Sequence, residues 1–143
     1  MNKKTTPFPQ LFLRIAIAAT MLSAVADRFG FWGKNSAWGN WENFEKYTAQ
    51  LTFFLSPALS KFAACAATFL EIVLSILLLS GFKIKLTATA TGILLLVFAL
   101  SMSASLGMKA PLDYSVWVGS AAAFLLADQK TARTMNTSRP QQT

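Results

Sequence analysis

The chain has 143 residues, a length typical of one domain. Hydrophobic residues make up 54% of it and charged residues 13%, which is about half of the roughly 25% found in soluble domains. The chain has no histidine and a single cysteine, Cys65. This composition excludes an intrachain disulfide, a CxxC pair, imidazole ligands for zinc or haem, and Ser-His or Cys-His nucleophiles. We therefore expect no metal and no covalent cofactor.

The formal net charge is +7, which in a soluble protein could indicate nucleic-acid binding. Here the lysines and arginines are scattered between apolar runs and do not form a patch. Such scattering is typical of membrane topology, because basic residues collect in the loops that stay on one side. We therefore predict a lipid bilayer, and not nucleic acid, as the partner of this chain.

Four apolar runs are long enough to suggest membrane spans, and they cover about residues 11–29, 57–80, 86–106 and 112–127. A spanning helix needs about 20 residues, so the fourth run is short. A soluble helical bundle is the alternative, but the third run has no charged face to turn toward water. The sequence predicts an all-α, integral membrane four-transmembrane-helix bundle. It forms a single domain over residues 1–130, followed by a disordered basic tail at 131–143.

Residues 40–55, between the first two runs, carry a different pattern. Trp41, Phe44 and Leu51 recur at helical spacing, and Glu42 and Lys46 form a favourable i,i+4 pair. The pattern predicts an amphipathic interfacial helix with its aromatic residues at headgroup level. The alternative is a lid or partner-docking surface over the bundle.

Counting the basic residues predicts the topology. With the N-terminus inside, eight lysines and arginines lie inside and five outside, which favours cytoplasmic N- and C-termini. An alternative remains open, because Ala24, Val25 and Ala26 precede Asp27 as in a signal-peptidase site. Cleavage there would remove residues 1–26 and leave three spans.

Small and polar residues form stripes inside two of the runs. In the second run the stripe should face the other helices, whereas Cys65 lies on the opposite, lipid side. We expect the same of a stripe in the first run. The two stripes are Ala64, Thr68, Glu71 and Ser75, and Ala16, Thr20, Ser23 and Asp27.

Glu71 lies near the middle of the second run, where an unpaired carboxylate is costly. We expect either a neutral acid or a pair with Arg14 or Arg28 from the first run. A functional residue and a protonated side chain that binds a neighbouring hydroxyl are equally compatible with the sequence.

Four further residues lie at the same end of the predicted bundle: Asp27, Arg28, Asp113 and Tyr114. Together with Glu71 beneath them they could form one outward-facing ligand-binding pocket. Ordinary roles are the alternative. Asp113 would suit a helix dipole, Arg28 could bind headgroup phosphates, and Asp27 could form a rim ion pair.

The chain resembles the DoxX family of small four-span bacterial membrane proteins. The resemblance lies in a Glu at the start of a Leu-rich run that ends in Gly, here Glu71 to Gly81, and in the basic turn with Lys83 and Lys85 that follows. It extends over four segments: LFLRIAIAATMLSAVADRFGFWG, GNWENFEKYTAQL, FLEIVLSILLLSGFKIKLTATATGILLLVFAL and GMKAPLDYSVWVGSAAAFLLA.

The resemblance implies an accessory subunit of a membrane redox system in the bacterial inner membrane, either quinone-linked or tied to oxidative stress. Such a subunit would bind a small apolar ligand, such as a quinone, or a membrane or peripheral oxidoreductase. Without histidine and with one cysteine, the chain is not expected to be catalytic alone. Two alternatives remain: a small transporter with Glu71 as its proton or substrate site, and a purely structural membrane adaptor.

Overall fold

The computed structural model describes the backbone of residues 8–136 and the side chains of residues 8–129. Every regular element within this part is helical. The elements are α1 (Phe8–Arg28), the short 3-10 helix η1 (Gly33–Asn35), α2 (Trp41–Leu51), α3 (Pro57–Ser80), α4 (Ile84–Leu106), α5 (Lys109–Asp113) and α6 (Val116–Asn136).

Three helices, α1, α3 and α4, are long and apolar enough to cross a membrane. The all-α class and the membrane character predicted from the sequence are thereby confirmed. The fourth helix begins later than expected, because Ser115, with φ of 56°, separates α5 from α6. Among the residues whose side chains the structure describes, its apolar part covers Val116–Gln129. The helix continues to Asn136, into the segment 131–143 that was expected to be disordered, and residues 137–143 lie outside the described part.

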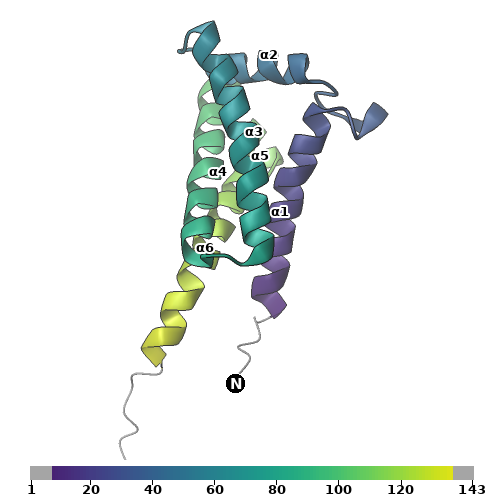
Figure 1. Ribbon diagram of the computed structural model, residues 1–143. Coiled ribbons are helices and arrows are strands. Elements are labelled where there is room, and N and C mark those ends of the chain that lie inside the picture. The colour runs from purple at the N-terminus through teal and green to yellow at the C-terminus, as the bar shows by residue number, and fades with distance from the viewer. Residues whose placement is uncertain (1–7, 137–143) are drawn as a thin grey trace, which may run out of the picture.

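The four long helices lie side by side, and α2 crosses one end of them (Figure 1). We call this end the α2 end. The opposite end, where α1 begins and α3 turns into α4, is called the Lys83 end. Helix α1 packs mainly on α3, and α4 packs mainly on α6. The apolar core lies toward the Lys83 end and consists of Ile17, Ala18, Met21, Leu74, Leu78, Ile84, Ala88, Ala123, Leu126 and Ala127.

The rotation of α3 agrees with the sequence prediction. All four residues of its small and polar stripe are buried, and Cys65 is exposed on the other side. The rotation predicted for α1 is wrong. Its buried face consists of Arg14, Ile17, Ala18, Met21, Val25 and Arg28, whereas Thr20 is exposed.

Two arginines explain the rotation of α1. Arg14 and Arg28 are 14 residues apart, about four helical turns, so they share one face. Both bind groups on α3, and a buried guanidinium is costly without such partners. Thr20 has no comparable need, because its hydroxyl donates to the Ala16 carbonyl at 2.9 Å within the same helix.

Arg14 joins α1 to the end of α3. Its Nε donates to the Leu78 carbonyl at 2.7 Å and its Nη2 to the Leu79 carbonyl at 2.8 Å. These carbonyls belong to the last turn of α3, where carbonyls lack the usual amide donor four residues later in the helix. The Leu78 carbonyl also accepts from the Gly81 amide at 3.2 Å. Gly81 follows with φ of 74°, the left-handed conformation in which many helices end. The sequence suggested Arg14 as one of two possible partners of Glu71, whereas in the structure Arg14 binds backbone carbonyls at the end of α3.

We predict that Gly81→Ala destabilises the protein more than Gly33→Ala does. Both glycines have positive φ, so each variant suffers a backbone penalty of about 1–2 kcal/mol. A Cβ on Gly81 would also lie 2.7 Å from Arg14 Nη2, whereas a Cβ on Gly33 would meet nothing within 4 Å. Thermal unfolding in detergent measures both losses. Equal losses would show that Arg14 moves aside freely and does not fix the end of α3.

Candidate functional site: a buried ion pair beneath an aromatic helix

The centre of the candidate site is an ion pair between Arg28, the last residue of α1, and Glu71 of α3. Each side chain keeps at most 4% of its surface exposed. Arg28 Nη1 also donates to the Thr68 hydroxyl at 2.7 Å, one turn before Glu71. The sequence left open whether Glu71 is a neutral acid or forms an ion pair with Arg14 or Arg28. The structure contains the ion pair, and the partner is Arg28. Removing either charge would leave the other buried without compensation.

The aromatic residues of α2 and of the loop before it cover the pair. The Arg28 guanidinium carbon lies 4.0 Å from the centre of the Phe44 ring and 5.6 Å from that of Trp38. These are cation–π distances, and the attraction increases where water is excluded. Trp38 in turn contacts Phe44 at 5.2 Å and Tyr47 at 5.4 Å between ring centres. Arg28 thus joins α1, α3 and the underside of α2.

Asp27 has a different role from the one expected. Its carboxylate accepts hydrogen bonds from the backbone amides of Ala37, Trp38 and Gly39 at 2.8, 2.9 and 3.1 Å. It therefore fixes the loop that carries Trp38 over Arg28. The sequence suggested a place for Asp27 in an outward-facing ligand pocket, with a rim ion pair as the alternative. In the structure, three amides in one tight loop offer its carboxylate several directed bonds at once.

Helix α2 is also fixed to the start of α3. The hydroxyls of Thr52 and Ser60 are 2.8 Å apart, and Lys61 Nζ lies 3.7 Å from a Glu45 carboxylate oxygen. Asn40 caps the helix by accepting from the Asn43 amide at 2.9 Å. Burial raises the pKa of the Tyr47 phenol, and the neighbouring Tyr114 adds to the effect.

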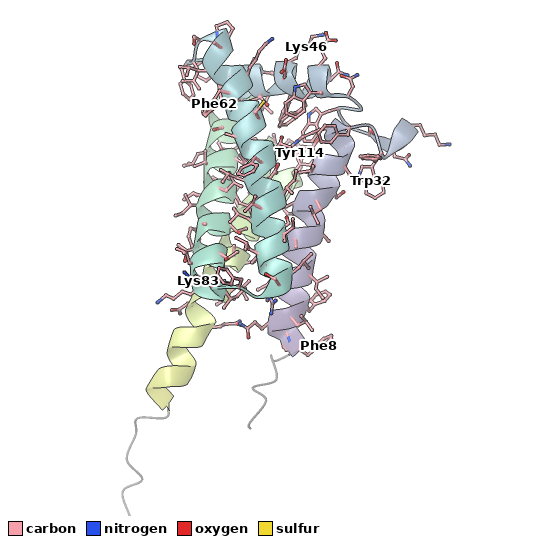
Figure 2. The ribbon with its side chains drawn as sticks, viewed as in Figure 1. Phe8, Trp32, Lys46, Phe62, Lys83 and Tyr114 are labelled. Atoms are coloured by element: carbon pink, nitrogen blue, oxygen red, sulfur yellow. The ribbon has the colours of Figure 1, made fainter. Side chains whose placement is uncertain are left out.

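The outward side of α2 is polar. Glu42 and Lys46 form the predicted i,i+4 pair at 2.8 Å and are both largely exposed. The hydrogen bond and the charge of Lys46 lower the pKa of the Glu42 carboxyl. Figure 2 shows Lys46 at the α2 end, with Trp32 and Tyr114 toward the same end and Lys83 and Phe8 at the other. The amphipathic pattern of the sequence thus corresponds to a helix with an aromatic underside and a charged outer side.

Asp113 and Tyr114 do not join Glu71. Asp113 pairs with Lys109 on the short helix α5, where both side chains are exposed, and Tyr114 is 71% exposed. The expected pocket required Asp113 to open a membrane span. Instead the chain ends α5 and turns at Ser115 before α6 begins, which keeps residues 113 and 114 at the surface. Among the side chains that the structure describes, no group of three His, Cys, Asp or Glu is placed to hold a metal ion.

The family model of the methylamine utilisation protein MauE matches residues 6–113. The chain belongs to this family. The match includes Arg28, Glu71 and α2, and it ends before α6 begins. No curated protein and no solved structure matched the chain.

The match to MauE overturns the resemblance to the DoxX family. The features that carried that resemblance have general structural causes in this chain. Gly81 provides the left-handed end of α3, and the Leu-rich run before it is the apolar part of a helix long enough to cross a membrane. Any packed pair of membrane helices joined by a short turn has these needs, so such features discriminate weakly between families.

A double-mutant cycle on Arg28 and Glu71 tests the pair. Glu71→Leu should destabilise the protein by about 3–5 kcal/mol, because it leaves the Arg28 charge buried without a partner. Glu71→Gln should cost less, since the amide keeps the shape and can still accept from Arg28. The double variant Arg28→Met, Glu71→Leu should have a free energy of unfolding close to that of the wild type, because two apolar side chains replace two compensated charges. Thermal and denaturant unfolding in detergent give the three values.

The exposed pair on α5 provides the control for this cycle. Asp113→Asn should leave the stability near that of the wild type, as expected for a surface ion pair. Additive losses in the double variant would mean that Arg28 and Glu71 do not depend on each other.

Proposed function

We propose that this chain is an accessory membrane protein of a methylamine-utilisation redox system, which binds an oxidoreductase partner through α2. The match to the MauE family supports a role in methylamine utilisation, and the long apolar helices support a location in a membrane. The chain has no histidine and only one cysteine, which is exposed on α3, so it cannot cycle a dithiol by itself. The partner would therefore carry the redox centre.

The arrangement of α2 is the observation that carries this proposal. The underside of α2 packs on Arg28 through Phe44, while its charged side faces outward. A helix held in this way presents a preorganised polar surface, which lowers the entropy cost of docking. A shallow groove between α2 and α3 extends this surface, and its lining is Glu42, Glu45, Lys46, Ala49, Pro57, Ser60 and Lys61.

A transport role for Glu71 is less well supported. Transport would require the carboxylate to exchange a proton or a substrate with water on both sides. Here the carboxylate is buried, paired with Arg28 and covered by the ring of Phe44. The proposal includes a quinone as a candidate small apolar ligand, but no binding site is assigned to it.

We further propose four spans in the bacterial inner membrane, with α6 as the fourth, α2 at the outer interface and both termini in the cytoplasm. The basic residues support this topology, because eight of the thirteen lie, in the sequence, before residue 15, at residues 83–85 or after residue 129, which are the parts of the chain that this topology places inside. The short apolar part of α6 can be accommodated by local thinning of the bilayer.

Reporter fusions test the topology. Fusions after Lys85 and after Arg133 should report the cytoplasm, and a fusion at Asn35 should report the periplasm. The positive-inside distribution of lysine and arginine is the reason for this expectation. An external C-terminus would contradict the four-span arrangement and support three spans after cleavage at Ala26.

The partner proposal is tested in a strain whose own copy of the gene is deleted. We expect the deletion to abolish growth on methylamine as the nitrogen source and the wild-type gene to restore it. The variant Glu42→Lys, Lys46→Glu keeps the i,i+4 pair but inverts the outward charges of α2. It should fold normally, lose the co-purifying oxidoreductase and fail to restore growth.

The exposed pair Lys109 and Asp113 provides a matched control at the same end, because exchanging these two residues also inverts a surface pair. This exchange should leave capture and growth unchanged. Mass spectrometry of the native complex identifies the protein partner and any quinone. The proposal would be contradicted if the deletion strain grew normally on methylamine. It would also be contradicted if the α2 variant still co-purified with as much oxidoreductase as the wild type.

A further inference from the structure

Three exposed aromatic residues follow the end of α1, in the loop that leads to α2. They are Phe29, Phe31 and Trp32, and we call this segment the aromatic turn. Phe31 keeps 80% of its surface exposed and Trp32 keeps 51%. These rings belong neither to the apolar core nor to the cover over Arg28. Neighbouring exposed rings of this kind mark a surface that contacts protein or membrane.

The backbone of the aromatic turn is well defined. The Gly30 amide donates to the Asp27 carbonyl at 2.9 Å and the Phe31 amide to the Ala26 carbonyl at 3.1 Å, which is the pattern of a Schellman motif at the end of a helix. Gly30 has φ of 76°, and a Cβ there would lie 2.6 Å from a carbonyl oxygen at the other end of the loop. Because the Asp27 carboxylate also holds the amides of residues 37–39, the loop is fixed at both ends.

Trp32 turns back along α1. Its indole Nε1 donates to the Ser23 carbonyl at 3.1 Å. Ser23 lies five residues before Arg28, the last residue of α1, which is about 7.5 Å along the helix axis. Figure 2 shows Trp32 on the side of α1 that is turned away from α3. Because α1 is long and apolar enough to cross a membrane, the Trp32 ring lies beside a spanning helix and not above its end.

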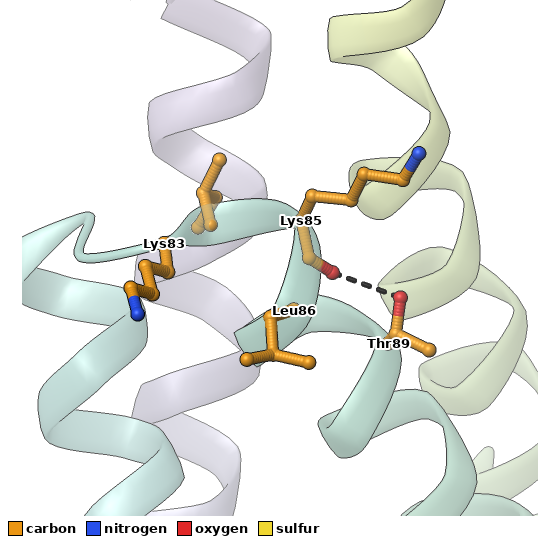
Figure 3. A pocket seen from close by; sticks show the side chains of 5 residues that line it. Lys83, Lys85, Leu86 and Thr89 are labelled. Atoms are coloured by element: carbon orange, nitrogen blue, oxygen red, sulfur yellow. Dashed lines mark hydrogen bonds between the residues drawn. The ribbon is translucent and has the colours of Figure 1, made fainter.

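The pocket at the Lys83 end has a different character. It lies at the turn between α3 and α4 and is lined by Lys83, Ile84, Lys85, Leu86 and Thr89. Figure 3 shows that the side chains of Lys83 and Lys85 extend in different directions, so their ammonium groups do not converge on one ligand. The Thr89 hydroxyl donates to the Lys85 carbonyl at 2.8 Å. In the aromatic turn, by contrast, the exposed rings come from one short segment with a fixed backbone.

We propose that the aromatic turn anchors the α2 end of the bundle in the boundary between lipid headgroups and acyl chains. Tryptophan suits this boundary because its ring is apolar while its N–H needs a hydrogen-bond partner, here the Ser23 carbonyl. Phe31 would lie among the first acyl carbons, where its exposed ring leaves water. Lipid is the favoured occupant because this surface continues the exposed side of a helix that lipid surrounds.

The sequence placed the aromatic residues at headgroup level in residues 40–55. In the structure, the aromatic underside of α2 covers Arg28 through Phe44. The contact with lipid therefore falls to the aromatic turn, which sets how deep the α2 end sits in the membrane.

Spin-label depth measurements on the full chain in phosphatidylcholine nanodiscs test the proposal. Cys65→Ser first removes the natural cysteine, which is exposed. In this background, Phe31→Cys places a nitroxide on the aromatic turn, and Glu42→Cys places one on the outward side of α2. The label at position 31 should collide more often with oxygen, which concentrates among acyl chains, than with a water-soluble nickel complex. The label at position 42 should show the opposite preference.

A second pair of variants tests the anchor itself. With the label at position 31, Trp32→Ser removes the ring and its bond to α1, so the label should shift toward collisions with the nickel complex. Trp32→Phe keeps an apolar ring and should shift less. Both variants should keep the helical circular dichroism of the parent, because the ring is half exposed.

Three outcomes would overturn the proposal. In the first, positions 31 and 42 prefer the nickel complex equally. In the second, position 31 is protected from both reagents, which would show that protein, such as a second copy of the chain, covers the turn. In the third, Trp32→Ser leaves the oxygen preference unchanged.

Discussion

Two opposite charges enclosed in an apolar bundle must meet, and in this chain they are Arg28 and Glu71. A buried guanidinium or carboxylate alone costs several kcal/mol, whereas in the pair each charge compensates the other, and Arg28 donates a further hydrogen bond to the Thr68 hydroxyl. This requirement fixes how α1 and α3 are rotated against each other. It also places the guanidinium under Phe44, so that the position of α2 depends on it.

Different kinds of interaction stabilise the two ends of the bundle. Toward the Lys83 end, apolar packing holds α1, α3, α4 and α6 together, and Arg14 satisfies the last carbonyls of α3. At the α2 end, directed polar bonds dominate, because Asp27 binds three loop amides and Arg28 binds α3. Membrane bundles gain little from moving apolar side chains between lipid and protein, so such directed contacts and close packing decide their geometry.

The sequence predicted the helical class, the amphipathic character of α2 and the buried stripe of α3, because each depends on local periodicity. It also limited the partner of Glu71 to two arginines. It did not predict that Asp27 binds the loop at residues 37–39, nor that Phe44 covers Arg28, because these contacts join segments whose spatial relation is set by the fold. The rotation of α1 was predicted incorrectly because Thr20 and Ser23 suggested a polar face, while Arg14 and Arg28 decide it. The family was misidentified from features that α3 and the turn after it need for structural reasons.

Hydrogen–deuterium exchange in lipid nanodiscs tests most directly whether the buried pair holds α2 in place. The comparison is between the wild type and the variant Arg28→Met, Glu71→Leu, whose bundle should stay folded. Without the guanidinium, Phe44 and Trp38 lose their cation–π contacts, so the amides of residues 41–51 should exchange faster while those of α3 and α4 keep their protection. Unchanged exchange over residues 41–51 would contradict the claim that Arg28 anchors α2 to the bundle.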